Sequence, residues 1–324
     1  MKRRILCCLA ALAGLHAAAV PAQPVESWPA RTLRIIVPFQ AGSFTDLAAR
    51  KLAVELSSQL GEAVVVENKV GAGGTIGADS VAKSAPDGHV MLLTENSFTV
   101  APALYSKLSY DARKDFIPLA IIAEAPTIMW GRPDLPVKSV RELVALAQSK
   151  PKSLNFASGG QGSSSHLAGE LFFEKARIDV VHIPFKGVAG SIAEAMASRV
   201  DFGTSSVASP MAQIKAGRLL PIAVTGKARN PLLPEVPTFA ESGYAEFDAP
   251  IWFGLLLPAG TPADIVSRLH AEVAKAAEKP DFKEIFAKQG AQAVTSSPQE
   301  FAQRISAEIQ QWQGLVDRAG IKIE

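Results

Sequence analysis

The sequence predicts an α/β fold of two similar lobes, with a chain that crosses between the lobes more than once. Short β-branched apolar runs alternate with helical patterns over residues 33–94, and the same alternation returns from residue 154 to residue 224. Short connections between such elements call for a parallel-rich sheet flanked by helices in each lobe. The chain has 324 residues, of which 48% are hydrophobic, so it is long enough for two cores.

The first lobe is expected to begin with strands at 33–37, 63–67 and 90–94. Between them lie a helix at 46–60 and another that runs from a glycine-rich segment to about residue 83. Gly61 ends the first helix, because glycine readily adopts the left-handed conformation that follows a helix C-terminus. Residues 105–115 are polar and predict an irregular segment. Strands at 119–123 and 127–130 then lead into the second lobe.

The second lobe is expected to alternate helices and strands in the same way. The predicted strands are 154–157, 180–183, 200–203 and 220–224, and the predicted helices are 140–149, one ending near 175, 191–198 and one after Thr204-Ser205-Ser206. A segment rich in proline, glycine and charge (227–250) returns the chain to a strand at 252–257 and to helices at 263–278, 281–289 and 297–319. These elements predict lobe 1 at 27–122 plus about 246–290, lobe 2 at 123–245, and a C-terminal helix (297–319) packed on the lobes.

The first 22 residues have the pattern of a secretory signal peptide. Lys2, Arg3 and Arg4 precede a short apolar run at 5–20, and Val20-Pro21-Ala22 places small residues where a signal peptidase cleaves. The apolar run is shorter than the roughly 20 residues of a membrane-spanning helix, which argues against an anchor. We therefore expect cleavage after about Ala22 and a periplasmic protein.

Removal of the signal peptide would change both the cysteine content and the net charge of the chain. Cys7 and Cys8 leave with it, so the mature chain has no cysteine nucleophile and no cysteine metal ligand. Loss of its three basic residues takes the formal charge from +2 to −1, which predicts no nucleic-acid partner. The four remaining histidines show no metal-ligand spacing, and no metal or cofactor is expected.

The stretch from Ile35 to Asp46 carries the most informative loop. A buried strand ends at Pro38, Gly42 permits a turn, and Ser43 or Thr45 can cap the helix that follows. Such a helix start presents free backbone N–H groups and a positive dipole end, which suit a small anion. The alternative is an ordinary strand–helix connection. Similar glycine- or serine-rich helix starts recur at 71–77 and 158–166, which favours the anion-binding interpretation.

Two enzymatic interpretations are alternatives to anion binding. The glycines at 71–77 follow a strand and open a helix, as in a dinucleotide-binding turn, and Glu95 at the end of the next strand could contact a ribose. Export argues against a soluble nicotinamide cofactor. The serine run before His166 does not match the Gly-x-Ser-x-Gly nucleophile motif. Serine hydroxyls and backbone N–H groups serve better there as anion ligands.

The chain resembles the Bug family, the periplasmic substrate-binding receptors of tripartite tricarboxylate transporters. The motifs that carry the resemblance are Ile-Val-Pro-Phe-Gln-Ala-Gly-Ser-Phe-Thr-Asp (36–46), Val-Val-Glu-Asn-Lys-Val-Gly-Ala-Gly-Gly-Thr-Ile-Gly-Ala (65–78), Ala-Pro-Asp-Gly (85–88), Pro-Ala-Leu-Tyr (102–105), Gly-Ser-Ser-Ser-His-Leu-Ala-Gly-Glu-Leu-Phe (162–172), His-Ile-Pro-Phe-Lys-Gly (182–187), Pro-Glu-Val-Pro-Thr (234–238) and Trp-Phe-Gly-Leu (252–255). They cover nearly the whole mature chain in order.

This resemblance implies a two-lobed periplasmic-binding-protein fold (a venus flytrap, type II-like) that holds a small carboxylate between its lobes. The ligand-binding residues that it implies, together with those singled out above, are Phe39, Gly42, Ser43, Phe44, Thr45, Asp46, Ser158, Gly159, Gly162, Ser163, Ser164, Lys186, Thr204 and Ser205. Alternatively, Asp46 only interacts favourably with the dipole of the helix that it begins. Lys186 can be either a surface lysine or a cation of the pocket.

Two departures from the family pattern bear on specificity. Gly42-Ser43-Phe44-Thr45-Asp46 stands in the first loop where the family usually has Gly-Gly-x-Thr-Asp, and Thr204-Ser205-Ser206 replaces a frequent Phe-Asp-Asn. Phe44 in the pocket wall would favour a carboxylate with an aromatic or apolar body.

We therefore expect a monomeric receptor, not an enzyme, that delivers a carboxylate to integral-membrane tripartite transporter subunits. The alternatives are an exported α/β hydrolase-like enzyme and a sensory solute receptor for a signalling partner.

Overall fold

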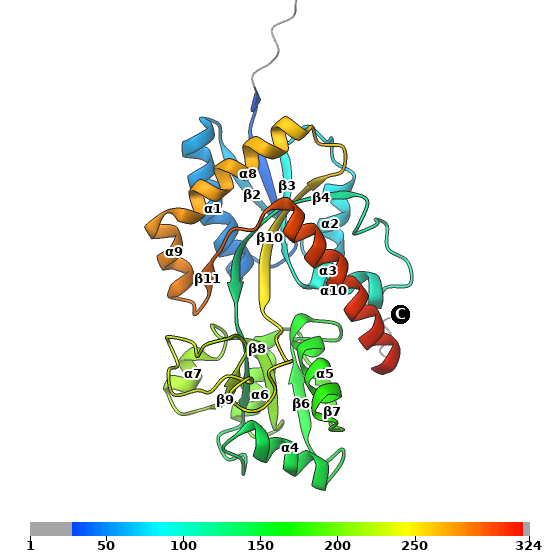
Figure 1. Cartoon of the computed structure of the whole chain (residues 1–324), viewed down its shortest axis with the longest axis vertical. Coiled ribbons are helices and arrows are strands. Elements are labelled where there is room, and N and C mark those ends of the chain that lie inside the picture. The colour runs from blue at the N-terminus through cyan, green and yellow to red at the C-terminus, as the bar shows by residue number, and fades with distance from the viewer. Residues whose placement is uncertain (1–27, 320–324) are drawn as a thin grey trace, which may run out of the picture.

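The computed structural model describes residues 28–319, which form two α/β lobes joined by two chain crossings (Figure 1). The predicted signal peptide and its predicted cleavage site lie outside the described residues. Within 28–319, no helix is both long enough and apolar enough to cross a membrane.

The first lobe is built on a six-stranded sheet in the order β11-β4-β10-β3-β1-β2. Its strands are β1 (Leu33–Val37), β2 (Val64–Asn68), β3 (Val90–Glu95), β4 (Phe116–Ala125), β10 (Ile251–Pro258) and β11 (Gln292–Ala293). Its helices are α1 (Phe44–Leu60), the short 3-10 helix η1 (Ala72–Gly74), α2 (Thr75–Ala82), α3 (Ser97–Leu104), α8 (Ala263–Glu278) and α9 (Pro280–Ala287). Helices α1, α8 and α9 cover one face of this sheet, and α2 and α3 lie on the other side (Figure 1).

The second lobe is built on a five-stranded sheet in the order β7-β6-β8-β5-β9. Its strands are β5 (Thr127–Gly131), β6 (Asn155–Ser158), β7 (Val181–Pro184), β8 (Phe202–Ser206) and β9 (Leu220–Val224). Its helices are α4 (Val140–Ser149), α5 (Ser164–Ala176), α6 (Val188–Met196) and α7 (Met211–Lys215).

Both sheets are mixed, and the strands next to the crossings are the antiparallel ones. Strand β1 pairs in parallel with β2 and β3, and β6 pairs in parallel with β7 and β8. By contrast, β10 runs antiparallel to β3 and β4, and β5 runs antiparallel to β8 and β9. The chain enters the second lobe through Pro126, between β4 and β5, and returns through residues 225–250 to β10. The predicted two-lobed α/β class is confirmed.

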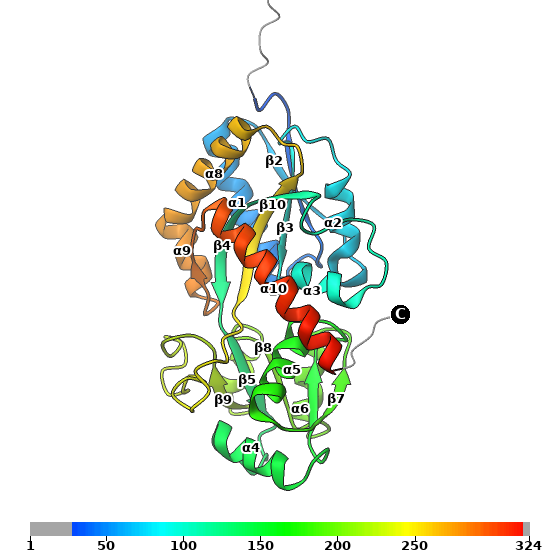
Figure 2. The same cartoon turned by 45° about the vertical axis from the view of Figure 1, so that its right-hand side comes forward.

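Helix α10 (Pro298–Ala319) packs on both lobes (Figures 1 and 2). Its first half contributes Phe301, Ile305 and Ile309 to a core cluster of the first lobe. Its second half contributes Trp312 and Leu315 to the main core cluster of the second lobe. Because these apolar side chains are buried in clusters of both lobes, α10 helps to fix the position of one lobe relative to the other.

Most predicted elements occur in the structure within a few residues of their expected bounds. Helix α3 and the two-residue strand β11 are not among the predicted elements. The residues Thr204-Ser205-Ser206 were expected to follow a strand and lead into a helix, but they belong to β8, and α7 begins only at Met211. The antiparallel pairing of β8 with β5 extends through Ser206, opposite Thr127, and this pairing keeps the segment extended.

Candidate functional site

A cleft of about 370 Å³ lies between the two lobes and is lined by residues of both. We call it the interlobe cleft. Its walls from the first lobe are Phe39, Gly73, Glu95, Ser97, Val100, Ala101, Leu104 and Tyr105, and those from the second lobe are residues 159–165, Gly187 and Val188. The cleft therefore has a wall rich in apolar groups from α3 and a polar wall from the loop that precedes α5.

The N-terminus of α5 forms the polar wall. Ser163 is the N-cap, and its hydroxyl accepts a hydrogen bond from the N–H of His166. The backbone N–H groups of Ser164 and Ser165 have no acceptor within residues 28–319. Both groups are at the positive end of the helix dipole, so this helix start offers two donors to an anion in the cleft.

The loop that leads into α5 is held in place by its own hydroxyl groups. The N–H of Gly159 donates to Ser165 Oγ at 2.9 Å, and Ser163 Oγ donates to the carbonyl of Gly160 at 2.8 Å. Gly160 and Gly162 have φ values of 134° and 72°, which side-chain-bearing residues rarely adopt. Because its bonds are internal, the loop presents a preorganised surface to the cleft.

Two stacked histidines support this loop from behind. His166 Nδ1 accepts a hydrogen bond from the N–H of Gly162 at 3.0 Å, and the His166 and His182 rings stack with centroids 3.8 Å apart. Burial, with a contribution from His166, lowers the pKa of His182 to about 3, so this ring is neutral. Both histidines thus support the loop, and the His182 ring does so without adding charge.

The same region bears on the hydrolase alternative. Ser158 Oγ lies 2.7 Å from His182 Nε2, as a nucleophile and its base would. However, Ser158 is fully buried, also bonds to Gly160, and does not line the cleft. The pair therefore joins β6 to β7 and cannot meet a substrate in the cleft.

The first loop, by contrast, is organised around Asp46. The Asp46 carboxylate accepts hydrogen bonds of 2.9 Å from the N–H of Gly42, from Arg50 and from Asn68, and Ser43 caps α1 by accepting from the Asp46 N–H. Burial raises the pKa of Asp46, but the bonds from Arg50, Gly42 and Asn68 lower it below its ordinary value. Asp46, Gly42 and Ser43 lie outside the cleft lining, where they fix the loop that carries Phe39.

Phe44 is placed differently from the sequence-based expectation. Its ring is partly buried and packs against Phe253 and Phe286 of the first-lobe core, with centroid distances of 4.5 and 5.5 Å. Thr45 is buried beside it. Phe39 lines the cleft and Phe44 does not. The chain turns at Gly42, so the start of α1 lies against the core of the first lobe.

Three further residues that the sequence predicts as ligand-binding lie outside the lining of the interlobe cleft, namely Thr204, Ser205 and Lys186. Thr204 Oγ1 donates to the carbonyl of Ser165 at 2.6 Å, and Ser205 Oγ accepts from the indole N–H of Trp130 at 3.0 Å. Both hydroxyls are buried within the second lobe, where Thr204 supports the first turn of α5. Lys186 is exposed on the loop between β7 and α6, next to Gly187 in the cleft wall.

The structure thus brings Phe39, Gly159, Gly162, Ser163 and Ser164 together in the cleft. The sequence did not single out the α3 wall, nor Glu95 and Ser97 as parts of this site. The available signal is Glu95, an acid at the end of a strand, which the sequence suggests only as a ribose ligand. Of the glycines at 71–77, Gly73 lines the cleft, and Gly77 has a packing role, since a Cβ on it would lie 2.8 Å from Pro38 Cβ.

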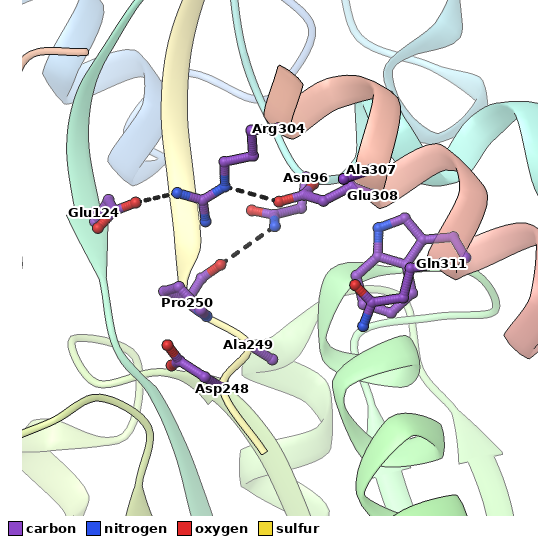
Figure 3. A pocket seen from close by; sticks show the side chains of 10 residues that line it. Asn96, Glu124, Asp248, Ala249, Pro250, Arg304, Ala307, Glu308 and Gln311 are labelled. Carbon is purple, nitrogen blue, oxygen red and sulfur yellow. Dashed lines mark hydrogen bonds and ion pairs between the residues drawn. The ribbon is translucent and has the colours of Figure 1, made fainter. Parts of the chain in front are cut away.

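A second cavity, the hinge pocket, lies where the returning chain meets α10 (Figure 3). It is lined by Asn96, Glu124, residues 248–250 and residues of α10 between Arg304 and Trp312. The Arg304 guanidinium lies between the carboxylates of Glu124 and Glu308 (Figure 3). Burial and repulsion from Glu124 raise the pKa of Asp248 on the other side of the pocket. The charges here are largely paired with one another.

The protein has two lobes with a cleft between them, and preorganised hydrogen-bond donors line that cleft. This architecture is that of a two-lobed solute-binding protein. Residues 48–321 match the family described as tripartite tricarboxylate transporter family receptor, and the chain belongs to that family. This family consists of periplasmic solute-binding receptors that work with a membrane transporter, so the expectation of a receptor and not an enzyme is confirmed.

Individual relatives are similar over most of their length. BugT of Bordetella pertussis is 35% identical over 301 residues, which cover 92% of each chain, and it confirms the Bug-family resemblance. The solved structure of Rpa4515 of R. palustris with adipate has a TM-score of 0.81 at 32% identity and covers 91% of this chain and 100% of its own. The solved structure of MatC of Rhodopseudomonas palustris with bound malate has a TM-score of 0.78 at 32% identity. The match covers 89% of this chain and 100% of the MatC chain.

Proposed function

We propose that this receptor binds a small carboxylate with an apolar or aromatic body in the interlobe cleft. The observation that carries the proposal is the pair of free N–H groups of Ser164 and Ser165 at the start of α5, directed by a preorganised loop. A carboxylate oxygen is a good acceptor for such groups, because the bonds are charge-assisted and the helix dipole adds to them.

The opposite wall supports the apolar body of the ligand. Phe39, Val100, Leu104 and Val188 line the cleft with carbon surface, while the described lining residues include no lysine, arginine or histidine. A ligand whose charge lies at the α5 end can therefore bury its hydrocarbon part against α3. The adipate and malate of the two solved relatives support a carboxylate as the ligand class.

The remaining parts of the proposal concern the cellular context. The chain is exported, its signal peptide is cleaved after about Ala22, and the mature monomer closes about its ligand by hinge motion at the two crossings. The closed form is the one that integral-membrane tripartite transporter subunits accept. The lobe limits expected from the sequence, 27–122 plus about 246–290 and 123–245, are kept in the proposal, except that the first limit moves to Pro126, where β4 of the first lobe has ended.

A thermal-shift screen of the mature chain (residues 23–324) tests the ligand class. The panel contains mono-, di- and aromatic carboxylates, and the primary amides of the same acids serve as matched controls. A carboxylate at about 100 times its dissociation constant is expected to add about 2.7 kcal/mol of stability, a shift of several degrees in Tm, while its amide adds little. Equal shifts with acids and amides, or none with any acid, would contradict the proposal.

A further inference from the structure

Helices α1 and α5 begin with the same hydrogen-bonding pattern, one in each lobe. In both, a glycine of positive φ (81° at Gly42, 72° at Gly162) precedes a serine N-cap. The serine hydroxyl accepts a hydrogen bond from the N–H three residues later, and the side chain of that later residue accepts from the glycine N–H. Asp46 accepts from Gly42 at 2.9 Å. His166 accepts from Gly162 at 3.0 Å, so His166 is the counterpart of Asp46.

The two helix starts differ in charge. Asp46 contributes a carboxylate, which Arg50 pairs with at 2.9 Å one turn further along α1. His166 contributes a ring nitrogen, Nδ1, and because Nδ1 accepts a hydrogen bond it carries no proton and the ring is uncharged. One turn along α5, Glu170 Oε1 lies 3.5 Å from His166 Nε2, the nitrogen that carries the proton in this tautomer. Helix α5 therefore has a neutral acceptor where α1 has a carboxylate.

This difference decides what each helix start can hold. A carboxylate in the first turn interacts favourably with the positive end of the helix dipole, and it repels a second anion at the same place. The first turn of α1 already contains such a carboxylate, and Gly42 and Asp46 lie outside the lining of the interlobe cleft. The first turn of α5 contains no acidic residue, and its start lines the cleft. The positive end of α5 is thus left to a bound anion.

We propose that His166 is a positioning residue of the anion site. Its imidazole supplies Gly162 with an uncharged acceptor, which holds the loop before α5 in the same conformation that a carboxylate holds at α1, and it leaves the positive end of the helix to the ligand. This inference rests on the proposed function, because it takes the ligand carboxylate to be at the α5 N-terminus.

The alternative is that His166 only packs. Its ring stacks on that of His182, with centroids 3.8 Å apart and planes 10° apart, so packing by itself could explain a histidine here. His166→Asn and His166→Asp both lose the ring and keep an acceptor, and they differ from each other by one charge. Asp46 shows that a side chain of this length reaches the glycine N–H from the equivalent position. His166→Phe keeps a stacking ring and loses the acceptor.

The surroundings make the comparison of the asparagine and aspartate variants a clean one. His182 presents its ring face to position 166, and its Nε2 lies 2.7 Å from Ser158 Oγ, so it offers no N–H to an introduced carboxylate. Glu170 would repel that carboxylate. The double variant His166→Asp/Glu170→Gln removes this repulsion and has the same formal charge as the wild type. Glu174→Gln removes a carboxylate two turns further along α5, where it pairs with Arg318, and serves as the control.

The experiment measures the dissociation constants of benzoate, hexanoate and adipate for the mature protein by isothermal titration calorimetry at about pH 7.5. His166→Asn and Glu174→Gln should bind within about threefold of wild type, because the loop bonds are retained. His166→Asp, alone or with Glu170→Gln, should bind at least about tenfold more weakly than His166→Asn, because its charge repels the anion. His166→Phe should also bind weakly, because the Gly162 N–H loses its acceptor.

Thermal unfolding of the free variants separates this effect from a loss of packing. A carboxylate suits the first turn of a helix, so the double variant His166→Asp/Glu170→Gln should have a Tm equal to or above that of His166→Asn. Its affinity should nevertheless be the lower of the two. A role in packing alone predicts that affinity and Tm fall together.

The contrary outcomes are distinct. Equal affinities of His166→Asp and His166→Asn would overturn the inference and leave the carboxylate receptor standing. Wild-type affinity of His166→Phe with a loss in His166→Asn would overturn it in favour of packing. Nitrogen NMR of the free wild-type protein should show an unprotonated Nδ1 at His166, and a protonated Nδ1 would overturn the inference without any ligand. No binding of any of the three acids by wild type would overturn the proposed function for these acids, and the inference with it.

Discussion

The indole N–H of Trp252 donates to the Glu308 carboxylate at 2.9 Å and joins the returning strand β10 to helix α10. Glu308 also accepts from Thr99 Oγ1 at 2.8 Å and from Arg304 at 2.9 Å. One side chain of α10 thus satisfies donors of β10 and α3 near the hinge. This cluster fixes α3, which forms the apolar wall of the cleft.

Replacing this carboxylate is expected to destabilise the protein. Glu308→Ala removes the acceptor of the Trp252 indole N–H, one of the two acceptors within reach of Thr99 Oγ1 and a partner of Arg304, which should lower the free energy of unfolding by about 2–4 kcal/mol. Urea titration followed by tryptophan fluorescence measures the change. Glu284→Ala removes an exposed carboxylate that pairs only with Lys288, and its midpoint should not move. A wild-type midpoint for Glu308→Ala would show that the cluster does not stabilise the fold.

The pKa of Asp46 leads to a prediction about acid stability. Because its folded pKa is lower than its unfolded value of about 3.9, the ionised form stabilises the protein above that pH, and the contribution is lost as pH falls through the folded pKa. Asp46→Asn should therefore be less stable by about 1–3 kcal/mol at pH 7. The difference from wild type should shrink below about pH 4. Equilibrium unfolding at several pH values tests the sign, and a difference that widens in acid would refute it.

Phe39 and Phe44 flank the same turn and should behave oppositely. Phe44→Ala removes a ring that packs on the core of the first lobe and should cost about 2–3 kcal/mol of stability with little change in ligand affinity. Phe39→Ala removes a cleft wall and should weaken ligand binding at a smaller cost in stability. Chemical unfolding and calorimetric titration of both variants separate the effects. A changed ligand range in Phe44→Ala alone would restore Phe44 as a pocket residue.

The hydroxyl of Thr204 is expected to act on the site through α5. Thr204→Val keeps the shape but leaves the Ser165 carbonyl without this donor, which should cost about 1–2 kcal/mol of stability and weaken ligand binding severalfold. Thr204→Ser retains the hydroxyl and should keep wild-type affinity. If Thr204→Ser is as impaired as Thr204→Val, the methyl group rather than the hydrogen bond is responsible.

Much of the fold could be predicted, because it rests on local patterns. The bounds of β1, β9, α4 and α8 agree with the sequence-based prediction to the residue, since each element combines clear periodicity with a proline, glycine or serine near one end. Helix α3 lacks such a pattern. It is buried over most of its length and contains β-branched residues and Pro102 inside the helix. These features favour a strand or a loop on local grounds, and only packing between the lobes makes the segment helical.

The candidate site was predictable where it depends on a single loop. Ser163, Ser164 and the glycines before them are adjacent in sequence, and a strand, a glycine loop and a helix start suffice to define them. Phe44 could not be placed in this way, because its partners Phe253 and Phe286 are more than 200 residues away. The sequence predicts Glu95 as an acidic residue at the end of a strand. Its place opposite α5 follows from the arrangement of the lobes, which local patterns do not encode.

The most direct test of the central claim removes one backbone N–H from the start of α5. Ser164 is the first helical residue and Ser163 before it is extended, so proline fits at position 164 without disturbing the helix. Ser164→Pro lacks the N–H, whereas Ser164→Ala keeps it and serves as the control for loss of the hydroxyl. Calorimetric titration with the carboxylate that gives the largest thermal shift should show at least a tenfold weaker affinity for Ser164→Pro and a nearly unchanged affinity for Ser164→Ala. Equal affinities of the two variants would contradict carboxylate binding at this helix N-terminus.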